Sequence, residues 1–283
     1  MTIYYQLSNL FFNFGFFKFM LYSVITINYN NREGLRSTIE SVVGQTFQDF
    51  EFIIIDGGSK DRSVDVIKEY EESITYWVSE RDRGIYHAMN KGIAQAKGDY
   101  CIFMNSGDCF YNHDVLRNIN NKLSSDIVIG KVAVDDNGNT ISPPPDGDLT
   151  FYHLYSGAIP HQGSFIKTEL LRKYPYDENL KISSDWKFFV QTMIWGNCSV
   201  SYIDDYVAKY DMEGLSSANP EMMRREKEKV LSEMFPPRLL ADYQRMKQCE
   251  CSVLSIAPEL RRYGRVDRLL YRIGRFLIKF VRA

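Results

Sequence analysis

Between residues 22 and 129 the chain alternates between two hydrophobic periods. Short runs of β-branched and aromatic residues, such as residues 22–27 and 50–56, are typical of buried strands. Between these runs, apolar residues recur every three or four positions, as in residues 35–45, and this spacing predicts amphipathic helices. Apolar strands separated by helices form parallel sheets covered on both faces. The pattern therefore predicts an α/β fold with an open, mostly parallel, twisted sheet flanked by helices.

The alternation continues to a strand at residues 99–104 and stops after residue 129. Beyond it, residues 131–142 are typical of a hairpin around an Asp-Asn-Gly turn, and the proline-rich residues 143–148 indicate a surface linker. The pattern predicts these other elements: helices at 63–72, 84–98, 168–173 and 184–195, a strand at 74–80, and strands near 199–210.

The composition is that of an ordinary globular protein. The 283 residues are 45% hydrophobic and 25% charged, which argues against a disordered or fibrous chain. A formal net charge of −2 gives no sign of a nucleic-acid partner. Five irregularly spaced cysteines favour free thiols in a reducing compartment, so we expect a cytoplasmic protein. The cysteines and the four histidines show no zinc spacing.

The first twenty residues are rich in phenylalanine, and Lys18 is their one charged side chain. They lack a basic start and a small-residue cleavage pattern, and Asn9, Asn13 and Gly15 interrupt a stretch that is short for a membrane span. We therefore expect residues 1–21 to be an extension outside the fold. An interfacial membrane anchor is the alternative.

Polar loops follow the predicted strands at the edge where open α/β sheets bind ligands. Asp56 ends one strand before two glycines, which either let a ligand approach the backbone or simply turn the chain. Residues 80–84 (ERDRG) place two arginines among two acids, where they engage phosphate or pair with those acids. Residues 105–108 (NSGD) place Asp108 where a carboxylate can hold Mg²⁺ or Mn²⁺ against phosphate oxygens, although N-S-G-D also suits a plain turn.

Asp185 lies in the first turn of the helix predicted from residue 184, next to Trp186. An acid at this place often complements the helix dipole. In a catalytic site the same carboxylate can act as a base, and the neighbouring ring can provide a platform for a sugar face.

Residues 23–67 and 80–108, taken in order, carry a series of motifs at characteristic distances. Together they resemble the nucleotide-sugar-binding half of family 2 glycosyltransferases of the GT-A fold, and the resemblance covers about residues 22–195. It is closest to the bacterial branch that builds exopolysaccharide, capsule or O-antigen units. In that branch N-[SA]-G-D commonly stands where other members carry D-x-D.

The resemblance implies a role for individual residues. Asp56 would accept a hydrogen bond from the base, expected to be uracil, and Arg83 would lie beside the diphosphate. The implied roles are nucleotide-sugar binding by Thr26, Asn28, Tyr29, Asp56, Asp82, Arg83 and Asn90, metal binding by Asp108, catalysis by Asp185, and acceptor binding by His161, Gln162 and Trp186.

The tetrad at 105–108 departs from the commoner family pattern. Asn105 and Gly107 replace the acids of D-x-D, so Asp108 is the one formal carboxylate left for a cation. Mg²⁺ keeps several waters and is often held by one or two carboxylates together with substrate phosphates. We expect Mg²⁺ or Mn²⁺ as the cofactor, with the strictness of the requirement left open.

Charge placement indicates the mechanism. An acceptor hydroxyl must be deprotonated on one face of the sugar, which is the role of Asp185, while the departing diphosphate is neutralised by the cation and Arg83 on the other. Direct displacement inverts the anomeric configuration, so no covalent glycosyl-enzyme is expected.

Residues 255–283 carry eight basic residues against two acidic ones. Apolar residues from 269 to 281 recur at helical spacing opposite the basic ones, which predicts a basic amphipathic helix lying on an anionic membrane. Docking against the catalytic domain or a dimer mate is the alternative. Lipid-linked acceptors are usual in the resembled branch, so we expect a peripheral location on the inner face of the plasma membrane.

These interpretations combine into three regions and one leading function. Residues 1–21 are the extension, 22–215 the catalytic domain with a nucleotide-sugar half (22–130) and an acceptor half (131–215), and 216–283 a helical region. The expected function is transfer of a sugar from a UDP-sugar to a lipid-linked saccharide by a hexosyltransferase-like enzyme, with a homodimer as one expected assembly. An inactive nucleotide-sugar-binding scaffold and a nucleotidyltransferase are the alternatives, although the latter usually shows a basic phosphate loop that is absent here.

Overall fold

The computed structural model of the chain describes residues 21–134, 140–141, 149–210, 219–250 and 272. The chain divides into two compact units, residues 1–227 and residues 228–283. The first unit holds the sheet and every candidate site residue named above. Neither the predicted N-terminal extension nor the predicted basic helix of residues 255–283 lies in the described part, apart from residue 21 and residue 272.

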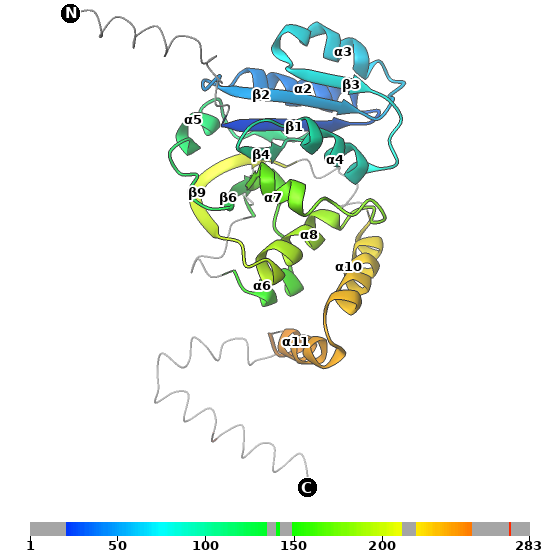
Figure 1. The fold of residues 1–283 in the computed structure, drawn as a ribbon, viewed down its shortest axis with the longest axis vertical. Coiled ribbons are helices and arrows are strands. Elements are labelled where there is room, and N and C mark those ends of the chain that lie inside the picture. Colours follow the sequence, from blue (N-terminus) through cyan, green and yellow to red (C-terminus); the bar gives the residue numbers. More distant parts are fainter. Residues whose placement is uncertain (1–20, 135–139, 142–148, 211–218, 251–271, 273–283) are drawn as a thin grey trace, which may run out of the picture. The chain divides into compact units, whose positions relative to one another are not determined.

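Four parallel strands form one half of the sheet (Figure 1): β1 (Tyr22–Asn28), β2 (Phe50–Asp56), β3 (Tyr76–Ser79) and β4 (Tyr100–Phe103). All seven residues of β1 and all four of β4 are buried, which fits strands with apolar side chains on both faces. Since the strands are parallel, their carboxyl ends meet along one edge of the sheet.

Helices connect these strands, as the hydrophobic periods predicted: α2 (Arg32–Val43), α3 (Ser63–Glu69), the short η1 (Glu71–Ser73) and α4 (Ile85–Gln95). Asn31 caps α2 by accepting a hydrogen bond from the Gly34 N–H at 3.1 Å. Gly92 lets α4 approach β1 closely, because a β-carbon there would lie 2.5 Å from Ile25 Cγ2.

The second half of the sheet is mixed, which corrects the expectation of a mostly parallel sheet. Next to β4 lies the antiparallel β8 (Ser164–Lys167), followed by β6 (Ile127–Ala133), β9 (Val200–Lys209) and β5 (Cys109–Phe110). In the described residues the strand order is β3-β2-β1-β4-β8-β6-β9-β5, with β7 (Thr140–Ile141) paired antiparallel to β6. Parallel pairing holds between β6 and β9, and antiparallel pairing between β5 and β9. The α/β prediction is confirmed.

Short helices surround this second half. They are α5 (Val115–Ile119), α6 (Phe151–Ser156), η2 (His161–Gly163), α7 (Thr168–Lys173), α8 (Ser184–Phe189) and the π-helix η3 (Val190–Trp195). The single helix predicted at 184–195 is therefore an α-helix that continues as a π-helix, and the strands predicted near 199–210 are the one strand β9.

Two further helices follow, α10 (Pro220–Met234) and α11 (Pro237–Glu250). They agree with the helical character predicted after residue 216. Among the described residues, no helix is long and apolar enough to cross a membrane.

Candidate active site

The carboxyl edge of β1, β2 and β3 brings three polar residues side by side. Strand register pairs Asn28 with Asp56, and Asp56 with Ser79. Both neighbours accordingly bond the central carboxylate: Asn28 Nδ2 donates to Asp56 Oδ1 at 2.7 Å, and Ser79 Oγ donates to Oδ2 at 2.5 Å. The sheet itself thus assembles this group of side chains.

Asp56 is fully buried and accepts further hydrogen bonds from the turn that follows it. Ser59 donates through its hydroxyl at 2.5 Å and its backbone N–H at 2.9 Å, and the Gly58 N–H donates at 3.2 Å. Burial raises the pKa of the Asp56 carboxyl, but these bonds outweigh it and leave the pKa below its usual value. Asp56 is ionised, and a nucleotide base that bonds to it must replace one of these donors.

Two predicted nucleotide-binding residues, one in β1 and one just after it, have opposite environments. Thr26 is fully buried and its hydroxyl donates to the Met104 carbonyl at 2.7 Å, so its side chain faces the fold. Tyr29 is 67% exposed. A β-carbon on Gly57 would lie 3.2 Å from the Tyr29 ring and 3.2 Å from Asp82 Oδ2, so these two side chains flank the glycine backbone.

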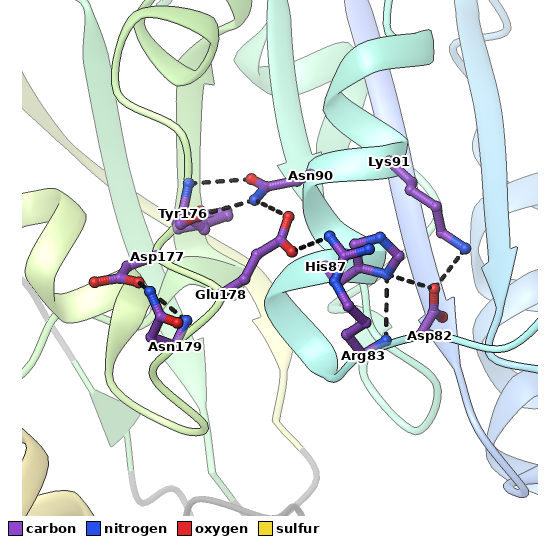
Figure 2. A network of polar contacts seen from close by, with 9 residues as sticks. All are labelled: Asp82, Arg83, His87, Asn90, Lys91, Tyr176, Asp177, Glu178 and Asn179. Carbon is purple, nitrogen blue, oxygen red and sulfur yellow. Dashed lines mark hydrogen bonds and ion pairs between the residues drawn. The ribbon is translucent and has the colours of Figure 1, made fainter.

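Asp82 belongs to a charged cluster at the start of α4 (Figure 2). Its Oδ1 atom lies 2.5 Å from Lys91 Nζ and 3.2 Å from His87 Nδ1. Lys91 also reaches Glu80 at 2.9 Å. Burial lowers the pKa of Lys91, but the two acids outweigh it and raise the pKa overall, so this cation is firmly charged.

Arg83 and Asn90 both reach across to the segment between α7 and α8 (Figure 2). The Arg83 Nη2 atom donates to Glu178 Oε2 at 2.5 Å. Asn90 accepts from the Tyr176 N–H at 3.0 Å and donates to the Tyr176 carbonyl at 2.9 Å and to Glu178 Oε1 at 3.2 Å. Both polar atoms of the Asn90 amide are thus engaged with this segment, and its role in nucleotide-sugar binding stays a prediction.

The tetrad at 105–108 forms a turn fixed by a hydroxyl from α2. Thr38 Oγ1 donates to the Asp108 carbonyl at 2.7 Å and accepts from the Gly107 N–H at 3.0 Å. Gly107 has a φ of 108°, a conformation that favours glycine. The Asp108 carboxylate is 4% exposed and accepts from Gln162 Nε2 at 3.1 Å.

Asp185 lies at the start of α8 between two donors from different elements. Tyr86 on α4 donates its hydroxyl to Oδ1 at 2.7 Å, and His161 Nδ1 on η2 lies 3.2 Å from Oδ2. Burial raises the pKa of Asp185, but His161 and Tyr86 outweigh it, so the pKa lies below its usual value. Burial and the Asp185 charge raise the pKa of Tyr86 well above its usual value, which keeps its hydroxyl protonated as a donor. Asp185 is therefore an ionised carboxylate whose side chain is 20% exposed.

His161 connects the candidate base with the tetrad. Its Nε2 atom lies 3.0 Å from Asn105 Nδ2. A proton on Nδ1 satisfies both contacts, because the ring then donates to Asp185 and accepts from the Asn105 amide. Burial lowers the pKa of His161, but Asp185 and Asp108 raise it above its usual value overall. With Gln162 on Asp108, the structure brings the predicted metal, acceptor and base residues into one polar network.

Trp186 does not offer the open platform suggested by the sequence. Its side chain is 3% exposed, and its Nε1 atom donates to the Leu154 carbonyl at 2.8 Å. Lys227 Nζ lies over the ring at 5.0 Å from the centroid. An indole buried in this way supports the α8 segment rather than stacking on a sugar.

The described residues contain no group of three or more histidine, cysteine or acidic side chains that could hold a metal ion. The tetrad nevertheless offers suitable donors of another kind. The buried Asn105 Oδ1 atom has no hydrogen-bond partner among the described residues, and Asp108 adds a carboxylate nearby in the same turn. One amide oxygen and one carboxylate fit a hard cation whose other ligands are diphosphate oxygens and water.

Sequence reasoning missed Tyr86, Ser79 and Glu178. Ser79 ends the strand next to β2, so its position beside Asp56 follows once the register is known. Tyr86 and Glu178 contact partners more than ninety positions away in sequence, and no local pattern reports such contacts.

Comparisons with known proteins identify the family and the fold. The model of glycosyl transferase family 2 matches residues 23–201. An uncharacterized glycosyltransferase of Mycobacterium tuberculosis (strain H37Rv) is 32% identical over 206 residues, which cover 69% of this chain and 76% of the relative. A PGL/p-HBAD biosynthesis glycosyltransferase of Mycobacterium bovis is 27% identical over 216 residues, covering 72% and 83%.

Two solved structures share the fold at lower identity. Residues 1–349 of TarS from S. aureus, in complex with UDP-GlcNAc, give a TM-score of 0.61 at 20% identity, covering 76% of this chain and 66% of that one, just under two thirds of its length. The mannosyltransferase PcManGT from Pyrobaculum calidifontis, in complex with GDP-Man and Mn²⁺, gives 0.59 at 16% identity, covering 91% and 80%. The neighbours thus share the GT-A fold. The family match and the M. tuberculosis relative show that this chain belongs to glycosyl transferase family 2, a family of sugar-transferring enzymes.

Proposed function

We propose that this glycosyltransferase moves a sugar from a nucleotide-sugar donor, with UDP as the expected nucleotide, to a lipid-linked saccharide, with inversion at the anomeric carbon. The observation that carries the proposal is the network in which Asp185 is held by Tyr86 and His161 beside the tetrad. Bacterial exopolysaccharide, capsule or O-antigen synthesis remains the proposed setting.

Asp185 is suited to take the proton of the acceptor hydroxyl. Each of its oxygens holds one side-chain donor, and a carboxylate has about four acceptor sites, so capacity remains for the incoming hydroxyl. The hydroxyl proton passes to Asp185 as the oxygen bonds to the anomeric carbon. The bond from that carbon to the phosphate oxygen breaks, and its electron pair leaves with the diphosphate.

The leaving diphosphate needs positive charge on the opposite side. Arg83 is 70% exposed, so its guanidinium can reach a ligand. Asp108 and Asn105 would hold a divalent ion, which when bound supplies charge stabilisation to the departing phosphate. The Mn²⁺ in the PcManGT complex supports this choice of ion.

The proposal is tested by measuring donor hydrolysis and transfer to lipid extracts with UDP- and GDP-sugars, with and without Mg²⁺ or Mn²⁺. Both nucleotides belong in the panel because the neighbours are bound to UDP-GlcNAc and GDP-Man. We expect turnover with at least one donor, its loss in Asp185→Asn, and a weakened metal response in Asp108→Ala. Donor binding without turnover on any acceptor would instead favour an inactive nucleotide-sugar-binding scaffold.

The membrane association is proposed on the sequence of residues 255–283 alone. Deleting them should abolish co-flotation with anionic vesicles while leaving donor binding intact. Flotation that is unchanged in the shortened protein would refute the membrane role of this segment.

A further inference from the structure

The segment between α7 and α8 carries Glu178, an acid that the proposed mechanism does not use. Asn90 on α4 pairs with both backbone groups of Tyr176 and also donates to Glu178 Oε1 at 3.2 Å (Figure 2). Asp177, which directly precedes Glu178, accepts from Lys187 Nζ at 2.6 Å. Glu178 is thus held by a segment tied to two helices, α4 and α8.

The second carboxylate oxygen of Glu178 accepts a hydrogen bond from Arg83, the arginine that is expected to bind the diphosphate. Arg83 Nη2 donates to Oε2 at 2.5 Å, and the Glu178 side chain is 31% exposed against 70% for Arg83 (Figure 2). A guanidinium has five N–H donors in a fixed fork, so one bond to Glu178 leaves the others for phosphate oxygens. The better buried and better anchored partner of this pair is the acid.

We propose that Glu178 is a positioning residue, which fixes the Arg83 guanidinium in the orientation that binds the leaving diphosphate. The inference rests on the proposed nucleotide-sugar function. A long, exposed arginine side chain loses rotamer freedom when it binds a ligand, and an anchored carboxylate removes part of that loss before the ligand arrives.

Glu178 is charged in this role. Burial raises the pKa of its carboxyl, but the hydrogen bonds from Arg83 and Asn90 outweigh it and leave the pKa below its usual value. The alternative interpretation of this ion pair is that Glu178 competes with the diphosphate for Arg83. The two readings predict opposite changes in diphosphate affinity when the Glu178 charge is removed.

The test uses Glu178→Gln in the full chain. Glutamine is neutral and has a single acceptor oxygen, so it cannot accept from Asn90 and Arg83 together, and the charge that holds the guanidinium is removed. Titration calorimetry with UDP and GDP, and with uridine and guanosine, separates diphosphate binding from nucleoside binding. Glu169→Gln is the matched control, because Glu169 is an exposed acid at the start of α7 with no hydrogen bond or ion pair to Arg83, Asn90 or Glu178 among the described residues.

We expect Glu178→Gln to weaken binding of the nucleoside diphosphate by about twofold to tenfold, the range in which ordering one long side chain contributes, and to leave nucleoside affinity unchanged. The same substitution should have no effect on diphosphate binding in an Arg83→Ala background, and Glu169→Gln should leave both affinities unchanged.

Tighter or unchanged diphosphate binding in Glu178→Gln would overturn the inference, as would equal losses for diphosphate and nucleoside. Failure of the wild-type protein to bind either diphosphate is a different result, because it overturns the proposed function together with this inference.

Discussion

Asp56 and Asp185 are both ionised acids with lowered pKa values, yet they occupy different kinds of site. Asp56, at the end of β2, accepts five hydrogen bonds from side chains and backbone groups, and is fully buried. Asp185, at the start of α8, accepts from two side chains and from the Trp186 backbone N–H, and its side chain is 20% exposed. The number of donors, rather than the pKa direction, separates a carboxylate that holds a turn together from one that can take a proton.

The contrast has a physical origin. Five donors exceed the roughly four acceptor sites of a carboxylate, so Asp56 gains a new partner only by exchange. Asp185 can accept a further hydrogen bond without losing one that it already has. A nucleotide base at the β2 edge would therefore rearrange the Ser59 or Ser79 hydroxyl, whereas an acceptor hydroxyl at α8 needs no rearrangement of the base.

The largest expected effect is that of Asp185→Asn on turnover. Loss of a positioned base should lower kcat by about 10²- to 10⁴-fold. Because the asparagine is nearly isosteric and Asp185 has two side-chain donors, thermal unfolding should change little. A decrease in kcat of less than tenfold, measured with the best donor of the panel, would remove Asp185 from the role of base.

Asp56→Asn, in contrast, should mainly lower the stability of the fold. The amide cannot accept all five hydrogen bonds, so buried donors lose their partners, and the free energy of unfolding should fall by roughly 2–3 kcal/mol. Urea unfolding of Asp56→Asn and Asp185→Asn side by side measures the difference. Equal stability of the two variants would contradict the distinction drawn here.

Tyr86→Phe sharpens the comparison at the base itself. Removing a donor to the ionised Asp185 disfavours the charged form, so the pKa of Asp185 should rise. In the wild type, Asp185 is ionised at any pH above its lowered pKa. Activity that needs this carboxylate is therefore lost only when the pH falls through that pKa. The acidic limb of kcat/KM should therefore move to higher pH in Tyr86→Phe, and an unmoved limb would show that Tyr86 does not tune the base.

The smallest expected effect concerns stability in acid. The pKa of Asp56 is lower in the folded state than its usual value, so its stabilising contribution is present above about pH 4 and is lost as the pH falls through the folded pKa. The wild type should lose stability over this acidic range, and Asp56→Asn should lose less. Urea midpoints measured between neutral pH and pH 3 report the difference, and parallel curves would exclude this contribution.

Local patterns predicted much of the nucleotide-sugar half of the fold, residues 22–130. Strands β1, β2 and β4 lie where their apolar runs indicated, and the loops after them carry the predicted polar residues. The reversal at β8 could not be predicted, because residues 164–167 are compatible with either strand direction and pairing is decided by distant partners.

The candidate site was predictable to a similar degree. Asp56, Asp108 and Asp185 follow from strand ends, a helix start and the resemblance, and the structure assigns each of them a definite environment. Trp186 contacts Leu154 and Lys227, and Asn90 bonds to Tyr176. Such contacts between distant segments leave no periodic trace in the sequence.

Thr38 ties the tetrad turn to the middle of α2 rather than to one of its ends. Its neighbours Leu35 and Ile39 are buried in the layer between this helix and the sheet. The position of the turn relative to the sheet therefore depends on how closely α2 packs against the sheet. A substitution in that apolar layer, outside the tetrad itself, would shift Asn105 and Asp108, the two residues proposed to hold the cation.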